Sequence, residues 1–87
     1  MFSGIITHRL RIEKREEAEY GLRVVVLKPE GRDLAQGESV LLNGICSTVV
    51  EINDESFAVD YMPETRTLTT VDSWVVGESV HFESSLC

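Results

Sequence analysis

The chain of 87 residues carries 15 acidic and 8 basic side chains, giving a formal net charge of −7, and 43% of its residues are hydrophobic. This composition excludes a disordered chain, and no apolar run approaches the roughly 20 residues of a membrane-spanning helix. The acidic balance and the scattered basic residues argue against nucleic acid as a partner. We therefore expect one soluble domain over residues 1–87, with no membrane partner.

The small size of the chain predicts association. A domain of this length buries only about 60% of the surface of its unfolded chain, so its core is marginal. We expect either a homo-oligomer or pairing with a second unit.

The two cysteines, Cys46 and Cys87, have neither the number nor the spacing of a disulfide framework or a zinc site. The N-terminal residues lack the basic and long apolar segments of a signal peptide. These features predict a cytoplasmic protein without a bound metal.

The hydrophobic residues recur with a period of two, which is typical of strands. In chain order, the predicted strands cover residues 6–12, 22–27, 39–42, 45–52, 57–62 and 79–83. The acidic and basic residues at 13–19 predict an exposed hairpin tip between the first two strands.

Three further features set the remaining connections. Asn43-Gly44 lies between two apolar runs and is a strong signal for a tight hairpin turn. Pro63 suits the first position of a helix that would end near Leu68, the only helix we expect. The tetrapeptide Gly-Glu-Ser-Val occurs at residues 37–40 and 77–80 and predicts two similar strand starts. Together, these elements predict an all-β fold, a small six-stranded Greek-key barrel with one short helix. One half of an open sandwich is the alternative.

Common catalytic signatures are missing from the sequence, including a Gly-rich phosphate loop, HExxH and G-x-S-x-G. His8 and His81 lie in strand patterns, where a lone histidine is more often a surface or core residue than a catalyst. Neither is expected to act chemically.

Three polar features stand out beside apolar strands. Cys46 and Thr48 share one face of a strand and offer a thiol and a hydroxyl, although a small buried pair is the alternative. Asp60 interrupts an apolar strand, although a solvated outer position would explain it as well. Residues 62–65 could present helix N–H groups to a ligand, or could be a simple N-terminal turn. All three features could line one site.

The motifs that carry these features resemble those of riboflavin synthase, in its amino-terminal lumazine-binding barrel. They are Met1-Phe2-Ser3-Gly4-Ile5-Ile6, then Gly37-Glu38-Ser39-Val40, Asn43-Gly44-Ile45-Cys46-Ser47-Thr48-Val49, Phe57 to Asp60, and Met62-Pro63-Glu64-Thr65. The order and spacing match over essentially all 87 residues.

The resemblance implies an activity in riboflavin biosynthesis. The family joins two similar six-stranded barrels in one chain, assembles as a trimer and dismutates two molecules of 6,7-dimethyl-8-ribityllumazine. One molecule gives four carbons to the other, yielding riboflavin without a metal or cofactor. Holding the two rings face to face supplies much of the rate. The implied partner of this chain is therefore a lumazine or flavin.

The resemblance also implies site residues at the matching positions. Those implied near the reacting end of the ligand are Phe2, Ser3 and Cys46. Those implied in ligand binding are Gly4, Ile6, Thr48, Asp60, Tyr61, Met62, Glu64 and Thr65, with the main chain of residues 60–62 hydrogen-bonding the pyrimidine edge or the ribityl chain.

This sequence also departs from the family pattern. Ser3 replaces a usual threonine, Ser47 replaces a leucine, and Arg66-Thr67 replaces Leu-Arg. The second barrel has no counterpart in these 87 residues, which fits either an excised domain or a natural one-barrel relative. Three functions follow as alternatives: the ligand-binding half of riboflavin synthase, a non-catalytic lumazine or flavin carrier, or a structural barrel whose pocket is filled by its own side chains.

Overall fold

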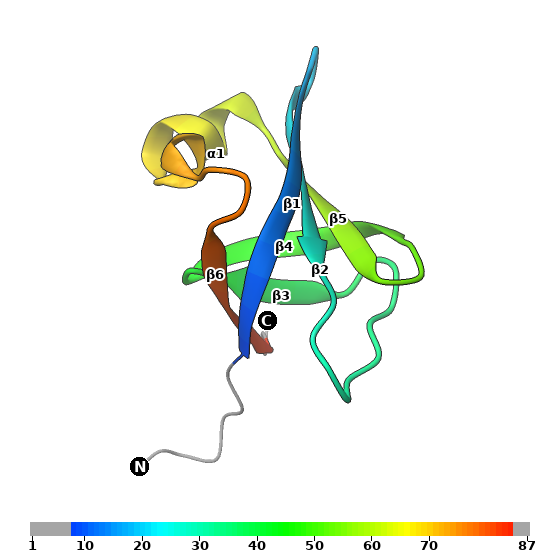
Figure 1. Ribbon diagram of the computed structural model, residues 1–87. Coiled ribbons are helices and arrows are strands. Elements are labelled where there is room, and N and C mark those ends of the chain that lie inside the picture. Colours follow the sequence, from blue (N-terminus) through cyan, green and yellow to red (C-terminus); the bar gives the residue numbers. More distant parts are fainter. Residues whose placement is uncertain (1–7, 85–87) are drawn as a thin grey trace.

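The computed structural model describes residues 8–84, which form six strands, one α-helix and a 3-10 turn (Figure 1). The strands are β1 (His8–Ala18), β2 (Gly21–Leu27), β3 (Ser39–Leu42), β4 (Ile45–Ile52), β5 (Ser56–Tyr61) and β6 (Ser79–Ser84). All six predicted strands are present, with bounds that differ at several ends. The first two predicted residues of the opening strand, at positions 6 and 7, lie outside the described residues.

The strands close into a barrel in the order β1-β2-β5-β4-β3-β6, with every neighbouring pair antiparallel. The neighbours β2 and β5, like β3 and β6, are not consecutive in sequence, as a Greek key requires. Closure removes most of the free edges that so small a sheet would otherwise expose. The predicted all-β barrel is confirmed.

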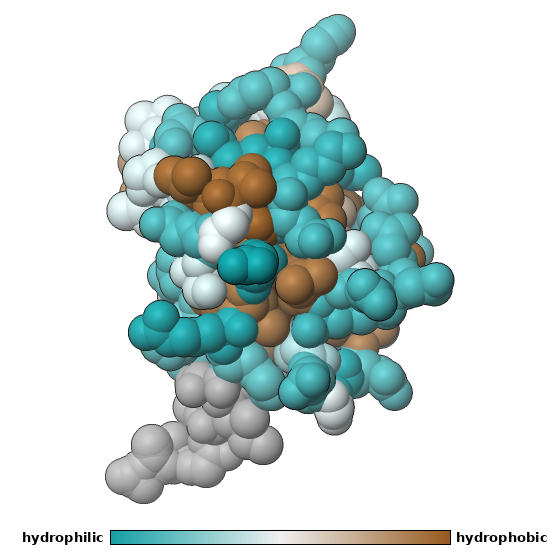
Figure 2. All heavy atoms as spheres, viewed as in Figure 1, coloured by the Kyte–Doolittle hydropathy of each residue, from teal (hydrophilic) through white to brown (hydrophobic). Residues whose placement is uncertain are grey.

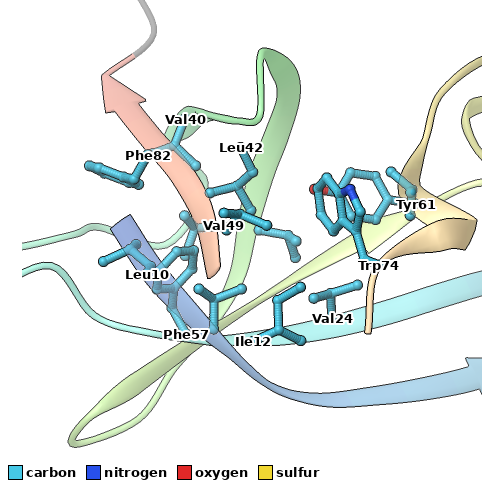
Figure 3. Close-up of a cluster of buried hydrophobic side chains, with 14 of the residues drawn as sticks. Leu10, Ile12, Val24, Val40, Leu42, Val49, Phe57, Tyr61, Trp74 and Phe82 are labelled. Atoms are coloured by element: carbon cyan, nitrogen blue, oxygen red, sulfur yellow. The ribbon is translucent and has the colours of Figure 1, made fainter. Parts of the chain in front are cut away.

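The barrel interior is filled by apolar side chains from all six strands (Figure 3). Phe57 and Phe82 contact each other edge to face at one end, with ring centroids 6.4 Å apart. Tyr61 and Trp74 form a second edge-to-face pair, with centroids 5.8 Å apart, at the other end. The interior is therefore a packed core, and a ligand has to bind on the outer surface.

The predicted hairpin tip at 13–19 is wrong. β1 continues to Ala18, which pairs with Gly21 of β2, so the tip consists only of Glu19 and Tyr20. This hairpin extends beyond the barrel (Figure 1). Beyond Ile12, every side chain of β1 is exposed or half-buried, so this part of the strand carries charged residues without the alternation that reveals a strand with one buried face.

The Asn43-Gly44 turn is confirmed. Both residues have positive φ angles, 52° and 80°, which is the signature of a type I′ hairpin turn. The turn fixes the register of β3 against β4 and so decides which β4 residues face outward.

In the described part of the chain, helical structure is limited to two short segments. The helix α1 (Pro63–Leu68) matches the prediction, whereas the 3-10 turn η1 (Val71–Ser73) was not expected. η1 is held by a single buried residue, Val71, and three residues are too few for a helical period to show in the sequence. Among residues 8–84, no helix is long and apolar enough to cross a bilayer.

Candidate functional site

Strands β4 and β5 are paired along only part of their length. Their register ends at Val49 opposite Val59, next to a β-bulge. Beyond this point, β5 remains paired with β2 and β4 remains paired with β3. The two strands therefore separate, and in the described part of the chain their facing edges at 46–48 and 60–62 have no ladder partner. We call this place the β4–β5 split.

Cys46 and Thr48 lie on the outer face of β4, beside the split. Both side chains are exposed, while the intervening Ser47 is buried. The alternative of a small buried pair is therefore wrong. Cys46 is a free thiol, and both groups are open to a ligand at the surface.

Asp60 lies on the opposite side of the split and is held in place by Arg23 of β2. The Arg23 guanidinium donates two hydrogen bonds to the Asp60 carboxylate, at 2.8 Å and 3.1 Å. The hydroxyl of Tyr20 adds a third at 3.2 Å. Only 18% of the Asp60 side chain is exposed, so this carboxylate is neither freely solvated nor free to rotate.

Arg23 itself connects two strands. Its Nη1 also donates a hydrogen bond to the carboxylate of Glu51 on β4, at 3.1 Å. This bond ties β2 to β4 across the outer surface of β5. Its hydrogen bonds to Asp60 hold the pKa of the Arg23 guanidinium above its usual value, against the opposing effect of partial burial. The arginine therefore stays charged and braces the wall of the split.

Tyr61 points inward, so only its main chain faces the split. Its side chain is 2% exposed, and its hydroxyl lies 2.6 Å from the hydroxyl of Ser47. Ser47 also donates to the carbonyl of Ile45 at 2.9 Å. This pair closes the barrel beneath the split, where no backbone ladder joins the strands.

The helix α1 begins directly after β5 and carries the last predicted residues of the site. Met62, at its N-cap, is 53% exposed, Glu64 is exposed, and Thr65 is half-buried. If the ladder register continued, Thr48 would lie level with Asp60, and Cys46 level with Met62. Four predicted side chains thus lie along the two edges of the split, with Cys46 and Thr48 on β4, Asp60 on β5 and Met62 directly after β5.

Arg66 holds α1 against the projecting hairpin. It donates two hydrogen bonds to the Glu17 carboxylate, at 2.7 Å and 2.9 Å, and one to Asp72 at 2.7 Å. These bonds lower the pKa of Glu17 and raise that of Arg66. The departure from the family pattern at this position therefore has a structural role, because it orients the helix that carries Thr65.

The predicted residues Phe2, Ser3, Gly4 and Ile6 lie outside the described residues. Their roles remain predictions.

A family model described as the lumazine binding domain matches residues 3–85 of the chain. The chain belongs to the lumazine-binding domain family. It is also 32% identical over 87 residues to riboflavin synthase of Bacillus subtilis, and 31% identical over 86 residues to that of Chlamydia trachomatis. The Saccharomyces cerevisiae riboflavin synthase is 41% identical over 54 residues, or 62% of this chain.

The similarity covers one part of each relative. The first two matches include 99% of this chain but only 40% and 43% of the relatives' lengths, and the yeast match includes 23%. The chain is thus a lumazine-binding barrel of the riboflavin synthase type and spans less than half of those proteins.

Sequence reasoning overlooked the two residues that organise this lumazine-binding barrel around the split. Arg23 lies directly opposite Asp60 in the β2–β5 register, and opposite charges within two apolar strands were the available signal. Ser47 was noted only as a departure from the family pattern. Its role depends on Tyr61, which is distant in sequence. Within residues 8–84, no group of three or more His, Cys, Asp or Glu is placed to hold a metal ion.

Alkaline pH is expected to destabilise the barrel through Tyr61. Burial raises the pKa of Tyr61 to about 12, and its bond with Ser47 opposes this only in part. In the unfolded chain the pKa is about 10. Between about pH 10 and 12, the hydroxyl of Tyr61 has lost its proton in the unfolded state but keeps it in the folded state. The free energy of unfolding therefore falls as the pH rises through this range, by roughly 2 to 3 kcal/mol in total.

Urea denaturation of the wild type and of Tyr61→Phe at several pH values checks this effect. The difference in free energy of unfolding between the two proteins should be constant below about pH 9. At higher pH the wild type should lose stability relative to Tyr61→Phe. A difference that stays constant up to about pH 12 would contradict the assignment.

Proposed function

We propose that the chain binds 6,7-dimethyl-8-ribityllumazine or riboflavin at the β4–β5 split, as the ligand-binding part of a riboflavin synthase-type enzyme. The observation that carries the proposal is the position of Cys46, Thr48, Asp60 and Met62 along the two chain edges that separate at the split. Membership of the lumazine-binding family supports the ligand class.

The split suits a planar heterocycle with an imide edge. A strand edge without a ladder partner offers alternating N–H and C=O groups, which match the donor and acceptors of a pyrimidinedione. The Thr48 hydroxyl lies beside this edge and both donates and accepts. Met62 is exposed and flexible, so its thioether packs over a ring. Thr65 and Glu64 extend the site toward the ribityl hydroxyls.

The reaction we propose is the dismutation of two bound lumazines, with four carbons transferred and no metal or cofactor required. Its rate rests largely on holding two rings in contact. Cys46 lies in this proposal near the reacting end of the ligand, as do Phe2 and Ser3. The whole reaction needs a second ligand, and therefore a second site facing this one.

The second site is proposed to come from another barrel, either of the same longer chain or of another copy. The split is an open surface, which leaves one face of a bound ring uncovered. Large apolar side chains are exposed in the segment that follows β5, at the two ends of α1 and after η1; they are Met62, Leu68, Val75 and Val76. Apolar patches interrupt the hydrophilic surface in the half of the molecule that carries α1 (Figures 1 and 2). Contact with a second barrel would cover these side chains and close the site.

A fluorescence titration of riboflavin and of the lumazine against the purified chain tests the binding proposal. We expect saturable quenching or a spectral shift, a raised melting temperature, and an affinity about tenfold lower for Thr48→Val, because one hydrogen bond is lost. Thr70→Val is the matched control, since Thr70 is exposed at the start of η1 and should leave the affinity unchanged. Equal binding by both variants would contradict the site, and no binding at all would contradict the function.

Product analysis then separates an enzyme from a carrier. Incubation of the chain with the lumazine, at concentrations that favour pairing of barrels, should yield riboflavin. Saturable binding without any riboflavin would instead favour the alternative function, a lumazine or flavin carrier.

A further inference from the structure

The two Gly-Glu-Ser-Val segments occupy equivalent places in the fold. The N–H of Glu38 donates to Ala35 at 3.0 Å, and the Glu38 carboxylate accepts from the N–H of Ala35 at 3.0 Å. Glu78 makes the same two bonds with Val75, at 3.0 Å and 3.1 Å. The prediction of two similar strand starts is therefore confirmed.

The same equivalence extends to the strands that these segments contact. Gly37 donates its N–H to the Val49 carbonyl, and Gly77 donates to the Ile12 carbonyl, both at 2.8 Å. Val49 and Ile12 in turn donate to the carbonyls of the two glutamates, at 2.9 Å and 2.8 Å. Ile12 of β1 is thus the counterpart of Val49 of β4.

Strand pairing follows the same internal two-fold relation. The β1–β2 register ends at Ile12 opposite Val26, next to a bulge, just as the β4–β5 register ends at Val49 opposite Val59 next to a bulge. Exchanging β1 with β4, β2 with β5 and β3 with β6 reproduces every neighbour in the barrel. The barrel therefore contains a second strand split, between β1 and β2.

This second split is the counterpart of the candidate lumazine site. Aligning Ile12 with Val49 places Arg9 at the position of Cys46, and Arg11 at that of Thr48. From His8 to Arg11, β1 pairs with β6 on its other edge, and within residues 8–84 the edge that faces β2 has no ladder partner, as in the first split. The two splits share a backbone arrangement and differ in side-chain chemistry.

A groove of about 360 Å³ occupies the second split. Its lining includes Arg9, Arg11, Leu27, Lys28, Glu30 and Ser79, and we call it the basic groove. Three of the eight Lys and Arg residues of a chain with net charge −7 line this groove, and among its described lining residues the one acidic group is Glu30.

The cations of the basic groove are available to a ligand. Arg9 and Arg11 are exposed and form no ion pair with any residue between 8 and 84. Among the same residues, the ammonium of Lys28 hydrogen-bonds only to a neutral group, the carbonyl of Asp54, at 3.2 Å. Two guanidinium groups on one face of β1, with an ammonium directly after the end of β2, match the charge and the several acceptor oxygens of a phosphate group.

We propose that the basic groove is a second ligand site on the barrel, which binds the phosphate group of a small molecule. The groove repeats the strand split of the lumazine site and replaces its thiol and hydroxyl with two guanidinium groups. Free inorganic phosphate and small phosphate monoesters share this chemistry. The analogy draws on the proposed function, but the groove has its own ligand and its own residues.

Titration of the 15N-labelled chain with inorganic phosphate, followed by NMR, tests this proposal. We expect saturable shifts of the backbone amides at residues 9–11 and 27–28, and about tenfold weaker binding for Arg9→Gln and for Arg11→Gln. Both arginines are exposed, so the variants should fold. Lys14→Gln makes the same charge change on the projecting hairpin and should leave the binding unchanged.

A second titration with glycerol phosphate distinguishes the two sources of phosphate. Tighter binding of the ester than of inorganic phosphate indicates a phosphorylated small molecule, whereas equal or weaker binding indicates free phosphate. Shifts that are absent, spread over the surface, or equally weakened by Lys14→Gln would overturn the proposal. That failure would leave lumazine binding untouched, because the flavin titration reads a different site.

Discussion

Replacing Gly21 with alanine should lower the free energy of unfolding by more than about 3 kcal/mol. Gly21 has a φ of +148°, which side chains rarely adopt, and an added Cβ would lie 2.0 Å from the carbonyl oxygen of Tyr61. The Cα of Met62 would be 3.2 Å away. All of these neighbours are backbone atoms, so the end of β5 has to move before the methyl group fits.

Gly31→Ala is the matched control. Gly31 also has a positive φ, +73°, but nothing lies within 4 Å of its added Cβ, so only conformational strain of about 1 kcal/mol is expected. Urea denaturation of both variants separates strain from collision. Equal destabilisation would contradict the close approach of β2 to the end of β5.

Gly21→Ala should also weaken ligand binding where the protein remains folded. The displaced backbone joins Tyr61 to Met62, which form one wall of the β4–β5 split. Titration of riboflavin at low temperature should therefore give a lower affinity for this variant than for Gly31→Ala. The same collision thus connects the stability of the barrel with its proposed function.

Local chemistry made much of the fold predictable. The Asn43-Gly44 turn requires two positive φ angles, which these residue types adopt readily. Pro63 suits the first position of a helix, because a backbone N–H there would have no intrahelical partner. The strand period placed Cys46 and Thr48 on one face of β4. It did not identify the outer face, because both faces of that strand carry apolar residues, such as Val49 and Val50.

The remaining features depend on contacts between distant segments. Arg23 and Asp60 are 37 residues apart, and they meet only because β2 pairs with β5. The internal two-fold relation leaves only Gly-Glu-Ser-Val as a visible repeat, since a strand split depends on where pairing ends and not on particular side chains. Such features become visible only once the register is known.

Ser47→Leu, which restores the residue usual in the family, should destabilise this barrel by roughly 2 to 5 kcal/mol. Ser47 is 2% exposed, and its hydroxyl lies 2.6 Å from that of Tyr61. A leucine would occupy the space of the tyrosine hydroxyl and leave it buried without a partner. Moving Tyr61 would also disturb its edge-to-face contact with Trp74.

A second substitution tests this dependence. Ser47→Leu combined with Tyr61→Leu removes the unpartnered hydroxyl and offsets the added volume, so the double variant should be more stable than Ser47→Leu alone. Urea denaturation of the wild type, both single variants and the double variant gives the coupling energy. Additive effects would show that Ser47 and Tyr61 act independently. A favourable coupling of 1 kcal/mol or more, on the order expected for residues in contact, would show that the serine is retained because the tyrosine closes the barrel beneath the split.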